Sequence, residues 1–171
     1  MPPVCQLEDY VLTRLHLDFI PPQEDEVQIN QARSAFNYSV GVHQKEKHRY
    51  RLEFCVKCHE ADSNGNKVGY ELDTEIVGFF SFGDSDPKEK MEMLVRLNGV
   101  SILYGILRGI VATASGSFPA GKFLLPTVMP QDVVESVEKG KAAAKKKEGT
   151  PAKKRTGSKK KAVSDGGKDH G

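Results

Sequence analysis

The stretch RYRLEFCVKCH, Arg49–His59, alternates between two kinds of side chain along its whole length. The residues at every second position are Tyr50, Leu52, Phe54, Val56 and Cys58. Most of the residues between them are charged or polar. Successive side chains of a β-strand point to opposite faces of the sheet, so a period of two predicts a strand with one buried face. The fold is therefore expected to contain a sheet that is covered on one side.

The same stretch contains CVKCH, which fits the C-x-x-C-H signature of haem attachment and uses a spacing found in zinc sites. Cys55 and Cys58 are three residues apart, so in a strand they point to opposite faces and cannot hold one metal ion or one haem. No second C-x-x-C pair and no H-x₃₋₅-H pair follows, and Cys5 is a poor third ligand. We expect no metal and no cofactor, with Cys58 buried and Cys55 and His59 on the outer face.

Similar patterns occur on both sides of this stretch, at Tyr10–Ile20, Ala35–Val42 and Gly69–Phe82. The residues expected on the buried face of the first of them are Val11, Leu15, Leu17 and Phe19. Pro21-Pro22 ends that strand, and Asn64-Gly65 is a strong hairpin signal before the last strand. Four strands joined by short connections predict an antiparallel meander with one buried face.

The hydrophobic period changes after the strands, and Asn98-Gly99 is expected to break or kink the first helical segment. Val100–Ser115, VSILYGILRGIVATAS, has the length of a helix that ends at Gly116. One apolar stripe is enough to cover a sheet, but this helix is apolar nearly all round, so a second subunit is expected on its other side. The residues expected at that oligomer interface are Ile102, Leu103, Tyr104, Ile106, Leu107 and Ile110.

The apolar run Val100–Phe118 is nearly as long as a membrane span, but Arg108 would lie near the bilayer centre at a cost of about 2.5–3.5 kcal/mol. We therefore interpret it as a helix of a folded domain. After a loop rich in proline, Pro130 is expected to begin a last helix. The expected fold class is α+β: a four-stranded antiparallel sheet, a long helix packed on it, a C-terminal helix, and then a basic tail.

The charge is distributed unevenly over the 171 residues. From Lys139 to Gly171 there are 12 Lys and Arg against 3 acids, a balance of +9, which leaves 13 basic and 20 acidic residues, a balance of −7, for the rest of the chain. We expect a domain over residues 1–138 and a basic, mostly disordered tail over 139–171. Such a tail can make weak contacts with nucleic acid or with an anionic membrane.

No arrangement of residues points to catalysis. The histidines fall on predicted wet faces and turns, and no phosphate-binding loop or nucleophile elbow is found. Glu71, Asp73 and Glu75 share one strand face, which favours an exposed acidic surface over an acid–base site. Three cysteines and the absence of an apolar leader favour a reducing cytoplasm. We therefore expect a cytoplasmic protein that is not an enzyme.

The order of elements resembles the protein-export chaperone SecB family. The helix and the loop after it, SILYGILRGIVATASGSFPAGKFLLP, are similar to the family pattern of Ile-Leu-aromatic, Arg, Gly-Ser-Phe-Pro and Leu-Pro. In this sequence the pattern falls on Ile102-Leu103-Tyr104, Arg108, Gly116–Pro119 and Leu124–Pro126, and Gly78–Phe82 is similar to the end of the family's fourth strand. The resemblance covers about residues 10–138.

The resemblance implies a holdase, a cytosolic chaperone that binds unfolded, export-bound chains in apolar grooves and passes them to the motor protein SecA. It also implies a homotetramer built as a dimer of dimers. The residues that it places at the polypeptide-binding groove and interface are Tyr70, Leu72, Thr74 and Ile76, and we add Phe36 and Tyr38 to them. Asp73 is the matching candidate for docking SecA.

Two features depart from the family pattern. Further docking acids of the family fall on His16 and Ile20 in this sequence, and the family's tail is not basic as this one is. A SecB-like chaperone of a toxin–antitoxin system is therefore an alternative to an export chaperone. A nucleic-acid or ribosome-associated protein that acts through the basic tail is a second alternative.

Overall fold

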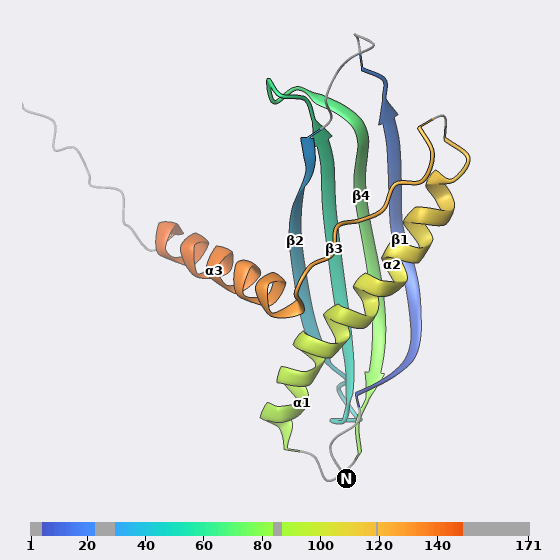
Figure 1. The fold of residues 1–171 in the computed structure, drawn as a ribbon. Helices are drawn as coiled ribbons and strands as arrows, with labels where there is room; N and C mark the ends of the chain where they lie inside the picture. The colour runs from blue at the N-terminus through green and yellow to red at the C-terminus, as the bar shows by residue number, and fades with distance from the viewer. Residues whose placement is uncertain (1–4, 23–29, 84–86, 119, 149–171) are drawn as a thin grey trace, which may run out of the picture.

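The computed structural model describes residues 5–22, 30–83, 87–118 and 120–148, and it contains one antiparallel sheet with helices on one side (Figure 1). The strands are β1 (Gln6–Ile20), β2 (Asn30–Val42), β3 (Arg49–Ala61) and β4 (Lys67–Ser81). The helices are α1 (Lys88–Leu94), a π-helical turn η1 (Val95–Gly99), α2 (Val100–Ser115) and α3 (Pro130–Glu148). This is the α+β arrangement that the sequence predicts.

The strand order is β1-β4-β3-β2, so the expected simple meander is wrong for the first strand. Strands β2, β3 and β4 follow one another as hairpins, whereas β1 pairs with β4. Pro21 and Pro22 cannot form a two-residue hairpin turn, and the nine residues between Ile20 and Asn30 are long enough to reach across the sheet. Three strand spacings amount to about 14 Å, whereas nine extended residues span about 30 Å.

The register of β1 also differs from the regular alternation that the sequence predicts. Its pairing with β4 shifts between Leu12 and Arg14, which leaves Thr13 as an extra residue. A bulge of this kind reverses the face to which the following side chains point. Leu12 therefore pairs beside the inward-facing Ile76, whereas Val11 lies opposite Val77 on the outer face and is 47% exposed. The expectation that Val11 shares a face with Leu15 is wrong for this reason.

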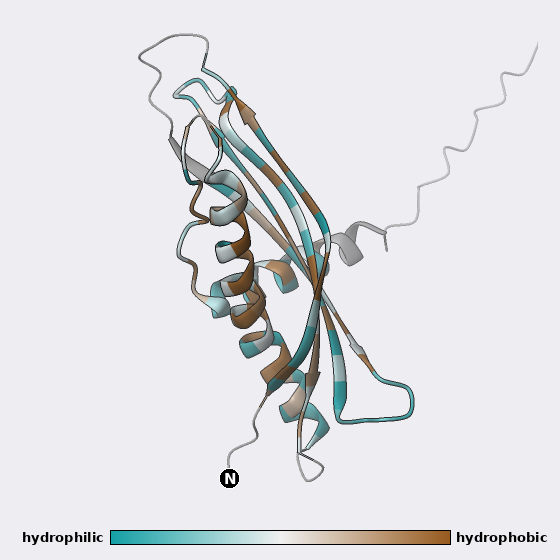
Figure 2. Ribbon diagram, turned by 90° about the vertical axis from the view of Figure 1, so that its right-hand side faces the viewer, coloured by the Kyte–Doolittle hydropathy of each residue, from teal (hydrophilic) through white to brown (hydrophobic). Residues whose placement is uncertain are grey.

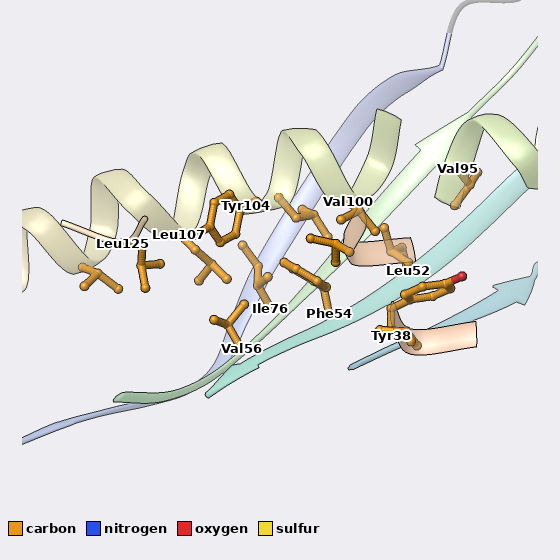
Figure 3. Packing of buried hydrophobic residues seen from close by; sticks show 14 of the residues in the cluster. Tyr38, Leu52, Phe54, Val56, Ile76, Val95, Val100, Tyr104, Leu107 and Leu125 are labelled. Atoms are coloured by element: carbon orange, nitrogen blue, oxygen red, sulfur yellow. The ribbon is translucent and has the colours of Figure 1, made fainter. Parts of the chain in front are cut away.

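The core lies between the inner face of the sheet and α2. Figure 2 shows α2 along one face of the sheet, with its apolar residues turned toward the strands. Figure 3 shows Phe54, Val56 and Ile76 of the strands beneath Tyr104 and Leu107 of α2. Phe54, Ile76 and Leu107 are fully buried. Burying side chains of this size stabilises the fold by about 1.5–3 kcal/mol each.

Two glycines allow the helices to approach the sheet closely. A Cβ at Gly78 would lie 2.8 Å from Cδ2 of Leu103, and one at Gly99 would lie 2.8 Å from Cδ2 of Leu52. Gly99 closes η1, the π-helical turn that joins α1 to α2. The pair Asn98-Gly99 therefore lies in a π-helical turn and does not break the helix, which runs on from Lys88 to Ser115; the expected kink remains a prediction.

The continuous run from α1 to α2, Lys88–Ser115, is long and apolar enough to cross a membrane by length and composition. In the fold, however, Val100, Leu103, Leu107 and Val111 are each no more than 1% exposed. These residues recur at helical spacing and face the sheet. Packing in the core accounts for the apolar character of this side of α2.

Helix α3 begins at Pro130, as the sequence predicts, and it projects from the β2 side of the sheet (Figure 1). Val133 and Val137 are buried where α3 contacts β2 and η1. The helix continues through Lys139 to Glu148, so the first part of the expected tail is helical. Residues 149–171 lie outside the described part of the chain, and disorder there remains a prediction.

Candidate polypeptide-binding surface

The residues predicted to bind polypeptide lie on the inner face of the sheet. Tyr70, Leu72, Thr74, Ile76 and Tyr38 are buried, and Phe36 is half-buried. The reason is that β4 is an inner strand whose inward side chains are covered by α2 and by the loop that follows it. Five of the six therefore form no exposed groove in this conformation, and a role for the set in polypeptide binding remains a prediction.

The loop between α2 and α3 is held on this face by hydroxyl groups. Tyr104 donates a hydrogen bond to the carbonyl of Pro126 at 2.6 Å, and Tyr70 donates to the carbonyl of Gly121. Ser115 accepts a hydrogen bond from the backbone N–H of Phe123 at 2.7 Å. Burial raises the pKa of Tyr104 to about 12, so its hydroxyl stays protonated and able to donate at neutral pH. The loop is therefore fixed at three points.

The fixed loop leaves some of its apolar side chains in solvent. Phe123 and Leu125 are buried beneath it, but Leu124 is 63% and Met129 is 61% exposed. Met93, at the end of α1, is 53% exposed. Exposed large apolar side chains, where several gather on one side of a protein, are typical of surfaces that bind other chains. Methionine suits varied partners because its side chain is flexible and polarizable.

Met93 also lines a hollow of about 290 Å³ between α1, η1 and α3. Its apolar walls are Met93, Leu97 and Val134. Glu89 and Glu92 stand at the same hollow, together with Arg96. The combination of apolar walls and two carboxylates suits an apolar segment that carries basic residues. We call Met93, Leu97, Val134, Leu124 and Met129 the apolar surface of the helical layer.

Tyr38 of β2 is the point at which α3 is attached to the sheet. Its hydroxyl donates to Oε1 of Glu138 at 2.6 Å, and Nζ of Lys141 lies 4.3 Å from the centre of its ring. Nζ of Lys141 also donates to the backbone carbonyl of Tyr38 at 2.8 Å. Burial, followed by Glu138, raises the pKa of Tyr38 far above its usual range. The residue predicted to bind a client is therefore occupied by α3.

The predicted oligomer-interface residues of α2 are divided between two sides of the helix. Leu103, Tyr104 and Leu107 are buried in the core of the subunit, so these three are not exposed to a second subunit in this fold, and an interface role for the set remains a prediction. They face the sheet because they share its side of a helix with 3.6 residues per turn. The other three predicted residues are half-buried, namely Ile102, Ile106 and Ile110.

The half-buried side of α2 forms an open groove with the edge strand β1. The groove has a volume of about 530 Å³ and is lined by Ile106, Gly109, Ile110, Thr113, Ala114 and Tyr10. Tyr10 is 44% exposed. A mostly apolar groove between a helix and an edge strand is suited to a protein partner.

Asp73 lies on the opposite, outer face of the sheet, as its place in the strand predicts. Its carboxylate is 2.9 Å from Nζ of Lys57 and 3.0 Å from Nε of Arg14. Lys57 and then Arg14 hold the pKa of Asp73 below its usual range. The register places His16 beside Asp73 and Ile20 beside Gly69. The candidate docking acid is therefore already paired with two cations of its own chain.

The C-x-x-C-H stretch has the orientation that the strand pattern predicts. Cys58 is buried, and Cys55 and His59 are half-buried on the outer face. Burial and the neighbouring Glu75 raise the pKa of the Cys55 thiol, which lowers its reactivity. Within the described ranges, no three His, Cys, Asp or Glu side chains are grouped so that they could hold a metal ion.

Several features of this surface were not found from the sequence. The exposure of Leu124 and Met129 depends on how the loop is pinned, and nothing local distinguishes them from Leu125. The bond from Lys141 to the Tyr38 carbonyl joins residues 103 positions apart. The neighbouring strand shows the same difficulty: Phe79 is 37% exposed and Phe80 is fully buried, although the two residues are identical and adjacent.

Comparison with known proteins adds a structural relative. No protein-family model and no curated protein matches the sequence. Among solved structures, the fold is similar to the SecB-like chaperone Rv1957 of Mycobacterium tuberculosis, which was solved in complex with a ChAD peptide from the antitoxin HigA1 (Rv1956). The TM-score is 0.59 and the identity is 15%, over 72% of this chain and 90% of that chain. The fold of this protein is therefore SecB-like.

Proposed function

We propose that this protein is a chaperone that holds unfolded polypeptides and catalyses no reaction. The observation that carries the proposal is the apolar surface of the helical layer, with Leu124, Met129 and Met93 more than half exposed, on a SecB-like fold. An unfolded chain offers apolar side chains in no fixed arrangement. A surface of leucine and flexible methionine can accommodate many of them.

The charge of the body supports the same proposal. The segment 1–138 contains 13 basic and 20 acidic side chains. Two of the acids, Glu89 and Glu92, lie beside the apolar hollow at α1. Acidic groups around an apolar surface attract basic segments and speed their encounter. They also keep an exposed apolar surface from binding the same surface of another copy, because like charges repel.

The proposal is tested by the aggregation of insulin after its disulfides are reduced, followed by light scattering. The protein is expected to suppress the scattering at comparable molar amounts without ATP. Met93→Ser and Leu124→Ser together should weaken suppression severalfold, because they remove apolar contact area. Val11→Ser, a similarly exposed apolar residue on the outer face, is the matched control. Undiminished aggregation with the unaltered protein would refute the proposal.

Two classes of client fit a holdase of this kind. Export-bound chains, delivered to SecA, follow from the resemblance to the SecB family. An antitoxin-like peptide is suggested by the ligand of the structural relative. The pairing of Asp73 with Lys57 and Arg14 favours the second class, because no free acid is presented at the position matching the family's docking acid. Binding of purified SecA, measured by calorimetry, decides between an export chaperone that delivers clients to SecA and a chaperone of antitoxin-like clients.

We also propose that subunits associate through the groove between α2 and β1, as in the tetramer predicted from the resemblance. Ile106 and Ile110 on one side and Tyr10 on the other give it an apolar lining. Light scattering after size exclusion is expected to give a multiple of the 18.9 kDa chain mass, four for a dimer of dimers. Ile106→Glu should reduce the mass toward one chain, whereas Val42→Glu, on a distant exposed strand end, should not.

The cytoplasm is the proposed place of action, supported by three cysteines that are all unpaired in the fold. Contact of the segment Lys139–Gly171 with nucleic acid or with an anionic membrane remains a prediction from its charge. Most of that segment lies outside the described residues. Deleting residues 149–171 should leave suppression of insulin aggregation intact and abolish any salt-sensitive retention on RNA or on anionic vesicles.

A further inference from the structure

The strand β2 forms one edge of the sheet, and its backbone groups alternate in direction. Phe36, Tyr38 and Val40 pair across from Val56, Phe54 and Leu52 of β3. The backbone N–H of His43 donates to the carbonyl of Arg49 at 2.8 Å, and counting back from this pair in the same register places the backbone groups of Tyr38 on the side away from β3, where its carbonyl accepts a hydrogen bond from Lys141. Because the direction reverses at each residue, the N–H and C=O groups of Phe36 and Val40 point the same way. A row of backbone donors and acceptors therefore faces outward from this edge.

The side chains of the same three residues belong to the apolar inner face. Tyr38 is buried, and Phe36 and Val40 are half-buried and packed against the core. A chain that paired with this edge would continue the sheet and bring alternate side chains beside them. Free backbone groups next to apolar side chains are the two elements by which an extended peptide is recognised in strand addition.

Lys141 occupies one place in this row. Its Nζ donates to the Tyr38 carbonyl at 2.8 Å, and it lies over the Tyr38 ring and 3.9 Å from Glu138. A lysine at a sheet edge is a common way to prevent pairing with another chain. Here the lysine comes from α3 and not from the strand itself. The protection can therefore be removed by moving this one side chain, while α3 and the sheet stay in place.

The position of α3 selects the kind of chain that fits. The helix projects outward from the β2 side of the sheet (Figure 1). A second sheet with its own helical layer would collide with α3 at this edge. A single extended strand needs only about 4.8 Å beside β2. The edge thus favours one unfolded segment over a second copy of this protein.

We propose that the β2 edge receives one extended segment of an unfolded polypeptide as a fifth strand, and that Lys141 leaves the Tyr38 carbonyl when the segment pairs there. This inference rests on the proposed chaperone function and assigns a second place where the client is held, in addition to the apolar surface of the helical layer. Backbone pairing is independent of client sequence, whereas the inner-face side chains favour apolar residues at alternate positions. The arrangement would therefore accept many clients in one geometry.

Amide hydrogen exchange of the full chain, resolved by NMR, tests the pairing, with reduced and carboxymethylated α-lactalbumin as the unfolded probe. In the free protein the amides of Phe36, Tyr38 and Val40 should exchange faster than those of Asn37 and Ser39, which face β3. With the probe bound, the first group is expected to slow at least tenfold. The second group should change little, because its hydrogen bonds already exist.

A pair of variants tests the role of Lys141. Lys141→Met keeps the apolar stem and removes the donor, so the probe should bind about threefold to tenfold more tightly, as expected when one competing hydrogen bond is lost. Lys139→Met makes the same change of charge two residues away, where the lysine is exposed and pairs with Glu135 at 3.0 Å. Its affinity for the probe should be unchanged.

The outcomes separate this inference from the function on which it rests. If the probe does not bind, as measured by the anisotropy of a fluorescent label, the proposed function fails. If the probe binds but the Phe36, Tyr38 and Val40 amides keep their exchange rates, strand addition at β2 is overturned and the chaperone proposal stands. Equal slowing of both groups of amides, or equal effects of the two lysine variants, also overturns the inference.

Discussion

The inner and outer faces of the same four strands differ in nearly every physical respect. At neighbouring positions of β3, Phe54 is fully buried under α2, whereas Cys55 is half-buried beside Glu75 on the uncovered side. The inner face is apolar and tightly packed. The outer face carries cross-strand ion pairs such as Arg14–Asp73 and Lys57–Asp73.

The difference means that the parts of the molecule that stabilise the fold are not the parts that are proposed to bind other chains. Burial on the inner face supplies most of the free energy of folding, because apolar area is removed from water there. Exposed ion pairs contribute roughly 0–1 kcal/mol each, because water and salt screen them. The surfaces proposed for binding lie at the margins of the inner layer, namely its loop, its helices and its two edge strands. There, apolar side chains are present but incompletely covered.

The largest expected difference between the faces is at Phe54 and Cys55. Phe54→Ala should lower the free energy of unfolding by about 3–5 kcal/mol, because it removes a fully buried ring and leaves a cavity. Cys55→Ala, one residue away, should cost less than about 1 kcal/mol. Urea denaturation followed by circular dichroism measures both. Similar losses for the two variants would contradict the assignment of the faces.

The bulge in β1 gives the next test of the comparison. Leu12→Ala should cost about 1–2 kcal/mol, because Leu12 is only partly buried at the edge of the core. Val11→Ala should change stability by no more than about 0.5 kcal/mol, since Val11 faces outward beside Val77. The same denaturation measurement applies. A larger loss at Val11 than at Leu12 would show that the register shift is absent.

The loop between α2 and α3 gives a further test, which lies within the inner layer itself. Tyr104→Phe keeps the ring and removes the hydrogen bond to the Pro126 carbonyl, so it should cost about 1 kcal/mol. Amide exchange of residues 120–129 should accelerate, because one of three attachments is lost. Tyr50→Phe removes a buried hydroxyl that has no hydrogen-bond partner within the described residues, so it should leave the loop exchange unchanged. Unaltered loop exchange in Tyr104→Phe would mean that the hydroxyl does not hold the loop.

The smallest effect is expected at Asp73 on the outer face. Asp73→Asn should cost less than about 1 kcal/mol at neutral pH, since both ion pairs are partly exposed. The folded-state pKa of Asp73 is lowered, so its contribution is complete above the unfolded value of about 3.9 and is lost as the pH falls through the folded pKa. The difference in the free energy of unfolding between the unaltered protein and Asp73→Asn should therefore disappear at low pH, as measured by urea denaturation. A difference that grew on acidification would be inconsistent with these ion pairs.

Part of the site follows from local pattern, and part does not. The strict alternation of Arg49–His59 is enough to place Cys58 inward and Cys55 outward, and thereby to remove the apparent haem signature. The predicted groove residues of β4 do face the inner layer, but the long helix that is expected on the sheet and the loop after it cover them, so they form no exposed groove in this fold. The six apolar residues of α2 were predicted as one interface, although three of them pack inside the subunit.

The sequence by itself determined the elements: four alternating strands, a helix of core character, and a last helix beginning at Pro130. These depend on backbone geometry that repeats every two or 3.6 residues and is visible within a short window. The tertiary structure alone decided the order β1-β4-β3-β2, the bulge at Thr13, the side of α2 that remains uncovered, and the bond from Lys141 to β2. Each of these joins residues distant in the chain, and many pairings are compatible with the same local pattern. The choice among them comes from packing of the whole core, which no short stretch encodes.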